Sequence, residues 1–107
     1  MRRVFIESPY AGNTAENERY LRAAMRDCLD RGEAPFASHG LYTQDGVLDD
    51  GVPSERAAGM AAGSLWRECA DVVAVYEDMG ISNGMREGIA HAHRLGVVVE
   101  YRRIGAT

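Results

Sequence analysis

The chain has 107 residues, of which 46% are hydrophobic, and these values indicate a single domain over residues 1–107 with a core of its own. The formal net charge of −4 gives no overall basic field, so we expect neither a nucleic acid nor a membrane as partner. The apolar run after Arg2-Arg3 is too short for a signal peptide or a membrane span, and we expect a cytoplasmic protein.

The two cysteines, Cys28 and Cys69, stand next to apolar residues in predicted helices. We interpret both as buried free thiols in a reducing compartment. No Cys-x-x-Cys motif or cysteine–histidine pair occurs at metal-ligand spacing, and His91 and His93 are two residues apart on a helix, which points them in different directions. The sequence therefore predicts no metal and no cofactor.

The N-terminal third predicts two strands joined by a helix. Residues 3–7 include a continuous apolar run, which is typical of a central parallel strand covered on both faces. Asn13 can cap a helix that carries an apolar stripe and ends at Gly32. Residues 33–38 form a weaker strand, and Pro35 favours an edge position for it.

The middle of the chain predicts a long loop and a helix with small side chains. Residues 39–53 are rich in glycine and aspartate and are too long for a simple connector, so we expect a functional loop or a dimer element. The helix predicted over 53–69 contains glycines and alanines that let another element approach closely. Its Leu65 and Trp66 offer apolar surface for a homodimer or higher homo-oligomer.

The last third predicts strand, turn, helix and strand. Residues 70–76 form the clearest strand, 80–85 a glycine-bracketed turn that opens a helix, and 97–101 the final strand. Strands and helices thus alternate along the whole chain. This order predicts an α/β fold, a small doubly wound and mainly parallel sheet of four to five strands with helices on both faces.

In such a sheet the ligand crevice lies at the carboxyl ends of the strands, where the strand order reverses. The segments predicted to meet there are 8–13, 39–42 and 77–85. A strand–turn–helix unit such as the one at 80–85 gathers backbone N–H groups at a helix N-terminus, where an anion or a sugar hydroxyl can bind. Glycine motifs of dinucleotide-binding and P-loop proteins are absent from the sequence.

Each candidate side chain has a functional and a structural interpretation. Tyr10 either faces a sugar or phosphate or covers an edge of the core, and His39 either hydrogen-bonds a base or ribose or has a structural role. Glu77 and Asp78 close a strand where catalytic carboxylates occur, although solvated loops also carry such residues. Glu87 stands in the first turn of a helix, where the helix dipole alone favours a carboxylate.

The segments 4–12 (Val-Phe-Ile-Glu-Ser-Pro-Tyr-Ala-Gly) and 82–85 (Ser-Asn-Gly-Met), the latter leading into the valines at 97–99, resemble the nucleoside 2-deoxyribosyltransferase-like superfamily. The nearest resemblance is to a branch of small phage and bacterial proteins. It implies N-glycosidic chemistry on a nucleoside or nucleotide, with a glutamate of the last helix attacking the anomeric carbon. It also implies an aspartate that protonates the leaving base, an N-terminal tyrosine that positions the glutamate, and assembly into oligomers.

The resemblance places the nucleophile eight residues before the glycine that ends the last helix. That glycine is Gly96, so the expected position is Gly88, and Glu87 is one residue away, which is a rotation of about 100° around the helix. Either the turn is remodelled so that Glu87 enters the site, or the nucleophile is lost. An enzyme, a nucleotide-binding or sensing module, and an accessory protein with an empty crevice all remain open.

These considerations give two sets of candidate residues. The candidate catalytic residues are Glu87, Asp78 and Tyr10. The candidate ligand-binding residues are Ser8, Pro9, Ala11, Gly12, Asn13, His39, Gly80, Ser82, Gly84 and Met85.

Overall fold

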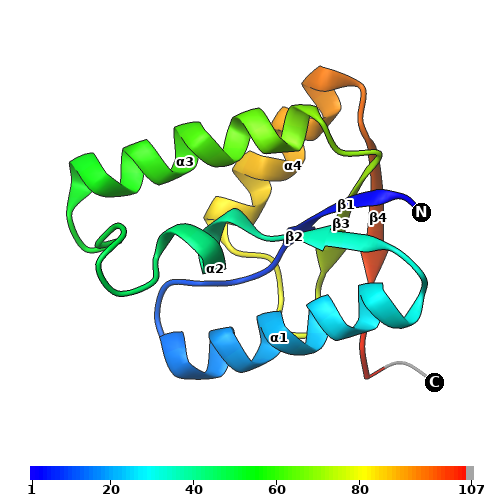
Figure 1. The fold of residues 1–107 in the computed structure, drawn as a ribbon, viewed down its shortest axis with the longest axis horizontal. Coiled ribbons are helices and arrows are strands. Elements are labelled where there is room, and N and C mark those ends of the chain that lie inside the picture. Colours follow the sequence, from blue (N-terminus) through cyan, green and yellow to red (C-terminus); the bar gives the residue numbers. More distant parts are fainter. Residues whose placement is uncertain (106–107) are drawn as a thin grey trace.

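The computed structural model describes residues 1–105 and shows one parallel sheet between two layers of helices (Figure 1). The strands are β1 (Arg3–Glu7), β2 (Ala34–Phe36), β3 (Val72–Tyr76) and β4 (Val98–Arg102). The helices are α1 (Thr14–Asp30), α2 (Ser38–Tyr42), α3 (Pro53–Glu68) and α4 (Asn83–Leu95). The described part of the chain contains four strands, and the predicted α/β fold with a doubly wound parallel sheet is confirmed.

The strand order is β2-β1-β3-β4, and every neighbouring pair is parallel. The chain runs from β1 outward to β2 and then returns past β1 to β3, so the order reverses between β1 and β3. The predicted edge position of the strand around Pro35 is confirmed, because β2 pairs with β1 only. The carboxyl ends of β1 and β3 therefore mark the crevice that this topology creates.

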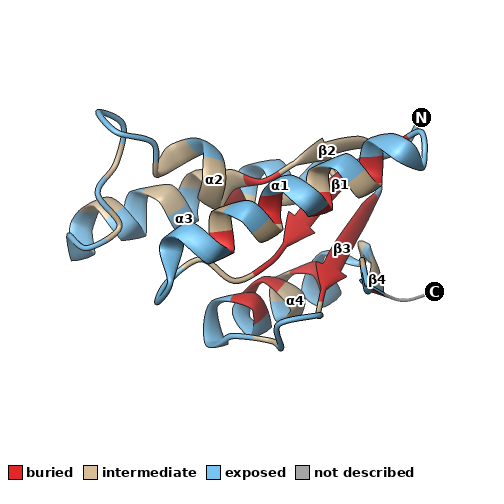
Figure 2. Ribbon diagram, turned by 90° about the horizontal axis from the view of Figure 1, so that it is seen from below, coloured by how far each residue is buried: buried red, intermediate tan, exposed pale blue. Residues whose placement is uncertain are grey.

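Two apolar clusters pack on opposite faces of the sheet, as the alternation of side chains along a strand requires. Helix α1 covers one face, where Leu21, Ala24 and Cys28 meet β1 and β3. Helix α4 covers the other, where Met85 and Ala92 meet the same two strands. Figure 2 shows β1 and β3 as the most deeply buried elements.

The predicted caps of α1 and α4 are present. Asn13 Oδ1 accepts a hydrogen bond of 3.1 Å from the backbone N–H of Glu16 at the start of α1. Gly96 ends α4 with a φ of 74°, a conformation that side-chain-bearing residues rarely adopt. Because α4 ends at the expected glycine, the count that places Gly88 inside the helix holds.

The predicted loop over 39–53 is partly wrong, because its first residues belong to α2, and the strand predicted over 33–38 is shortened to three residues. The cause is tertiary packing, since α2 is too short to carry an apolar period of its own. A Cβ atom on Gly63 of α3 would lie 2.5 Å from Ser38 Oγ, so α3 approaches α2 as closely as the small residues allow. The close approach predicted for the glycine-containing helix is thereby confirmed.

The two cysteines differ in environment. Cys28 is fully buried on α1, as predicted, but Cys69 is exposed, and the expectation that it is buried is wrong. Cys69 follows the last turn of α3 as its C-cap, where the chain leaves the helix at the surface. Among the described helices, none has the length and apolar character that crossing a membrane requires.

Candidate functional site

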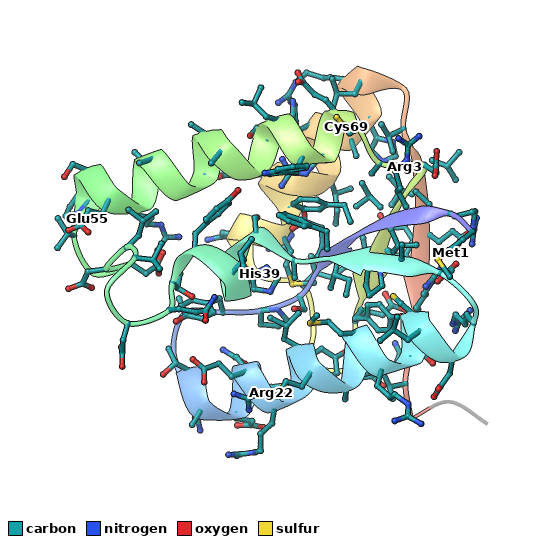
Figure 3. The ribbon with its side chains drawn as sticks, viewed as in Figure 1. Met1, Arg3, Arg22, His39, Glu55 and Cys69 are labelled. Atoms are coloured by element: carbon teal, nitrogen blue, oxygen red, sulfur yellow. The ribbon has the colours of Figure 1, made fainter. Side chains whose placement is uncertain are left out.

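A cavity of about 470 Å³ opens at the carboxyl ends of β1 and β3, within the size range of small-molecule sites. Its walls come from the loop after β1, from α2 and the loop that follows it, from α3 and from one side of α4. In Figure 3 the labelled His39 lies between α1 and α3 in the interior of the view, whereas Arg22 and Glu55 lie at the periphery. The cavity therefore stands at the crevice that the strand order predicts.

The floor of the cavity holds a buried ion pair between β1 and α3. Glu7, the last residue of β1, accepts two hydrogen bonds at Oε2 from Arg67, of 3.1 Å from Nε and 2.9 Å from Nη2. Only 9% of the Glu7 side chain and 12% of the Arg67 side chain are exposed. Burial raises the pKa of Glu7 to about 7, and the neighbouring guanidinium opposes this rise.

The Arg67 guanidinium is itself held from two further sides. It lies over the Phe5 ring, 4.7 Å from the ring centroid. Its Nη1 donates a hydrogen bond of 3.0 Å to His91 Nδ1, because an arginine can only donate. The His91 ring is therefore neutral with its proton on Nε2, in agreement with a pKa that burial and the charge of Arg67 lower. A guanidinium fixed in this way orients the carboxylate that it binds.

Helix α4 leaves room for the Glu7 carboxyl at Gly88. A Cβ atom built on Gly88 would lie 2.6 Å from Glu7 Cδ and 2.8 Å from Oε1, both inside normal contact distance. The carboxyl of Glu7 thus lies directly against the backbone of α4 at the position that the resemblance assigns to a nucleophile. Glycine is required there by space, since any side chain would displace the carboxyl.

The opposite wall contains a second buried polar pair. Ser8 Oγ and His39 Nε2 are 2.8 Å apart, and Tyr10 meets the His39 ring edge-on with centroids 6.2 Å apart. Burial lowers the pKa of His39 to about 4, so the imidazole is neutral at physiological pH. Asn17 of α1 fixes this wall, because its side-chain amide donates to the carbonyl oxygens of Tyr10 and Ala11 at 2.7 and 3.1 Å.

Most of the predicted site residues meet at this cavity. Ser82 is the N-cap of α4, and its hydroxyl accepts a hydrogen bond of 3.2 Å from the backbone N–H of Met85. Glu87 is exposed and lines the cavity from the first turns of α4. The predicted residues that line the cavity are Ser8, Tyr10, Ala11, His39, Ser82, Gly84, Met85 and Glu87.

Five predicted site residues do not line the cavity. Asp78 lies on the α1 side, where its carboxylate accepts hydrogen bonds from the Tyr20 hydroxyl and from the backbone N–H groups of Ile104 and Gly105. Asp78 therefore does not face the cavity, because the turn after β3 carries it to the layer of α1. Its neighbour Glu77 pairs with Arg103 at the surface.

The other four residues lie outside the cavity lining for local reasons. Asn13 is occupied as the cap of α1, and Gly80 forms the turn after β3, donating its N–H to the Glu77 carbonyl at 3.0 Å. Pro9 stands between two lining residues without lining the cavity, and Gly12 borders a separate and more open hollow beside it.

Sequence reasoning missed the ion pair and most of the contribution of α3. The sequence does contain a pattern that points to Glu7, because a carboxylate directly after an apolar run stands at the carboxyl end of a central strand. No sequence pattern points to Arg67, because its side chain reaches from α3 to a residue of β1 that is far away in the sequence. The main lining residues that are absent from the candidate set are Glu7, Ser38, Tyr42, Arg56, Ser64, Arg67, Gly88, His91 and Arg94, of which Tyr42 lies in the predicted segment 39–42. Within residues 1–105, histidine, cysteine and carboxylate side chains form no group of three or more suited to hold a metal ion.

Two solved structures share the fold. A 2-deoxyribosyltransferase from Bacillus psychrosaccharolyticus superposes with a TM-score of 0.67 at 15% identity, covering 98% of this chain and 75% of its own. The CMP N-glycosidase BcmB from Clostridium botulinum superposes with a TM-score of 0.55 at 12% identity, covering 95% and 69%. At these identities the similarity shows the fold, which is the fold that the sequence resemblance implies.

No curated protein sequence matches the chain. A family model matches residues 2–102, which is nearly the whole chain and includes every segment that lines the cavity. The chain therefore belongs to the family described as Domain of unknown function (DUF7768).

Proposed function

We propose that this protein binds a nucleoside or nucleotide in the cavity and cleaves or transfers at its N-glycosidic bond through a carboxylate. The observation that carries the proposal is the position of the cavity at the reversal of strand order, with carboxylates on one side and aromatic and hydroxyl groups on the other. The similarity in fold to a deoxyribosyltransferase and a CMP N-glycosidase supports the same class of ligand.

The groups around the cavity suit the parts of such a ligand. Tyr10 and Tyr42 offer aromatic faces and hydroxyls to a base or a sugar. Arg56 and Arg94 stand at the same cavity and can neutralise a phosphate. Glu87 lines the cavity from α4 and is the carboxylate that the sequence resemblance points to.

A second candidate function is a nucleotide-binding or sensing module without catalysis. The observation that favours it is Gly88, because the helix position expected to carry the nucleophile has no side chain. Such a module would gain thermal stability from its ligand without converting it.

One experiment separates the two functions. The protein is incubated with deoxynucleosides, ribonucleosides and their 5′-monophosphates, with and without a second base as acceptor, and free base and exchanged nucleoside are measured by chromatography. The proposal predicts release of base or exchange for at least one substrate, and reduced turnover in Tyr10→Ala. Glu68→Gln, on the exposed end of α3 outside the cavity, is the matched control with unchanged turnover. Binding without any release of base would support the second function.

We further propose a homo-oligomer formed through α3. Leu65 and Trp66 remain 65% and 50% exposed, although Trp66 also packs on Phe36 and donates to the Tyr42 hydroxyl at 2.7 Å. Size-exclusion chromatography with light scattering tests this, and a monomer at all concentrations would contradict it. The cytoplasmic location and membership of the phage and bacterial branch stay predictions.

A further inference from the structure

We propose that the carboxylate that attacks the sugar is Glu7, supplied by strand β1, and that Arg67 is its positioning residue. The inference rests on the proposed function, because it names the group that would carry out the reaction. The sequence resemblance implies instead a nucleophile on α4.

The two oxygens of the Glu7 carboxyl have different environments. Oε2 accepts both hydrogen bonds from Arg67, whereas no described residue donates to Oε1. Among residues 1–105, every buried side-chain nitrogen or oxygen has a hydrogen-bond partner. Oε1 has no partner, so it is not one of the buried atoms and must be exposed. The space beside Glu7 is the cavity, and Oε1 is therefore the carboxyl oxygen that faces it. One oxygen is held and the other is presented to a ligand.

The packing of α4 fixes where Oε1 lies. Gly88 is buried, and its missing side chain leaves the space that the carboxyl fills: Oε2 is the atom nearest to the place where a Cβ atom would be, and Oε1 lies 2.8 Å from it. The guanidinium of Arg67 is held in turn by the Phe5 ring and His91. A carboxylate held by Arg67 on one side and by the backbone of α4 on another is preorganised, which a nucleophile on a bound sugar requires.

Glu87 is the competing carboxylate, and its environment is different. It belongs to α4, one residue before Gly88, and is therefore turned about 100° away from the direction of Gly88. It is exposed, and none of the described residues forms a hydrogen bond or ion pair with its side chain. A solvated glutamate of this kind is free to adopt many rotamers, so it is suited to contact a ligand at the mouth of the cavity rather than to attack at its floor.

The reaction that follows from this geometry has two steps. In the first, an Oε1 electron pair of Glu7 forms a bond to the anomeric carbon while the bond from that carbon to the base nitrogen breaks; the base leaves with the electron pair and takes a proton from water. In the second, water attacks the anomeric carbon, the sugar–Glu7 ester bond breaks, its electron pair returns to the carboxylate, and the proton of the attacking water is released. An acceptor base in place of water gives transfer.

The charge of the pair fits this role. Arg67 stabilises the ionised carboxylate before attack and after the ester breaks, whereas burial keeps Glu7 poorly solvated and hence more reactive. With a pKa of about 7, the fraction of ionised Glu7 rises through neutral pH, so the rate should rise with pH across the same range.

The test compares Glu7→Gln and Glu87→Gln with the wild type on the substrate panel and adds a trapping reagent. The reagent is a panel of 2′-deoxy-2′-fluoroarabinosyl nucleosides, whose fluorine next to the anomeric carbon slows the breakdown of a sugar ester. Intact mass and peptide mapping then locate any covalent sugar. Glu68→Gln serves as the control outside the cavity.

We expect Glu7→Gln to lower kcat by at least about 100-fold, and more than Glu87→Gln does. We also expect a sugar adduct on Glu7 in the wild type. An adduct on Glu87, or a Glu7→Gln variant as active as the wild type, would overturn the inference and leave the proposed function intact. Binding without turnover would also overturn it, whereas failure to bind any nucleoside or nucleotide would refute the proposed function itself. If Glu7→Gln does not fold, the adduct site in the wild type decides.

Discussion

Replacing Gly88 by alanine tests whether the Glu7 carboxyl lies against α4. The new methyl carbon would stand 2.6 Å from Glu7 Cδ, and the carboxyl can retreat only by weakening its bonds to Arg67. Overpacking of this kind costs about 1–3 kcal/mol. The higher helix propensity of alanine offsets up to about 1 kcal/mol of this loss of stability. We therefore expect the free energy of unfolding to fall by roughly 1–2 kcal/mol, which lowers the Tm by roughly 5–15 °C in a domain of this size.

Two comparisons with further variants make this prediction specific. Gly84→Ala is the matched control, because it lies in the same helix with no atom within 4 Å of its would-be Cβ, and we expect it to be as stable as the wild type or more so. In a Glu7→Ala background the cost of Gly88→Ala should disappear, since the obstructing carboxyl is gone. Thermal and urea unfolding followed by circular dichroism measures the wild type, the three single variants and the double variant. A Gly88→Ala protein at least as stable as the wild type would refute the placement of Glu7.

Three further predictions concern the rest of the molecule. The pKa of Glu7 is about 7 in the folded state and 4.5 in the unfolded chain, so between these pH values the folded state keeps a proton that the unfolded chain has released. The free energy of unfolding should therefore fall by up to about 3 kcal/mol as the pH rises from 4.5 to 7. Urea unfolding of Glu7→Gln should lack this pH-dependent component. In the native protein Cys69 should react quickly with a thiol reagent and Cys28 only on unfolding, so mass spectrometry should find one modified cysteine; two fast reactions would contradict the burial of Cys28. Arg102→Met removes one partner of an ion pair with Glu33 whose side chains are 3% and 6% exposed. Glu33 keeps its second partner, Arg2, at 2.7 Å, so urea unfolding should show a loss of about 1.5–3 kcal/mol, and an unchanged stability would contradict the pair.

Much of the fold could be predicted from the sequence, because its signals are local. The apolar runs of β1 and β3, the cap at Asn13 and the glycine that ends α4 each indicate one element and its limits. The alternation of these elements was enough to predict a parallel sheet and the edge at which a site would lie. Helix α2 was not predictable in this way, since it forms by packing between α1 and α3 rather than from a period of its own.

Only those site residues could be predicted whose segments the strand topology brings to the crevice. Tyr10, His39 and Ser82 lie on segments that the topology brings to the crevice, and the structure places all three at the cavity. The contact of Asp78 with the α1 layer could not be predicted, because a turn of a few residues decides toward which helix layer it points. The pair of Glu7 and Arg67 joins residues 60 positions apart, and no local pattern carries such a contact.

The central claim is that a nucleoside or nucleotide binds in the cavity with its anomeric carbon next to Glu7. A crystal structure of the protein with a bound nucleoside 5′-monophosphate tests this most directly, because near-attack geometry places the reacting atoms about 3–3.5 Å apart. We predict that Glu7 Oε1 is the carboxylate oxygen within this distance of the anomeric carbon. A ligand whose anomeric carbon lies next to Glu87, or one that binds outside the cavity, would contradict the claim.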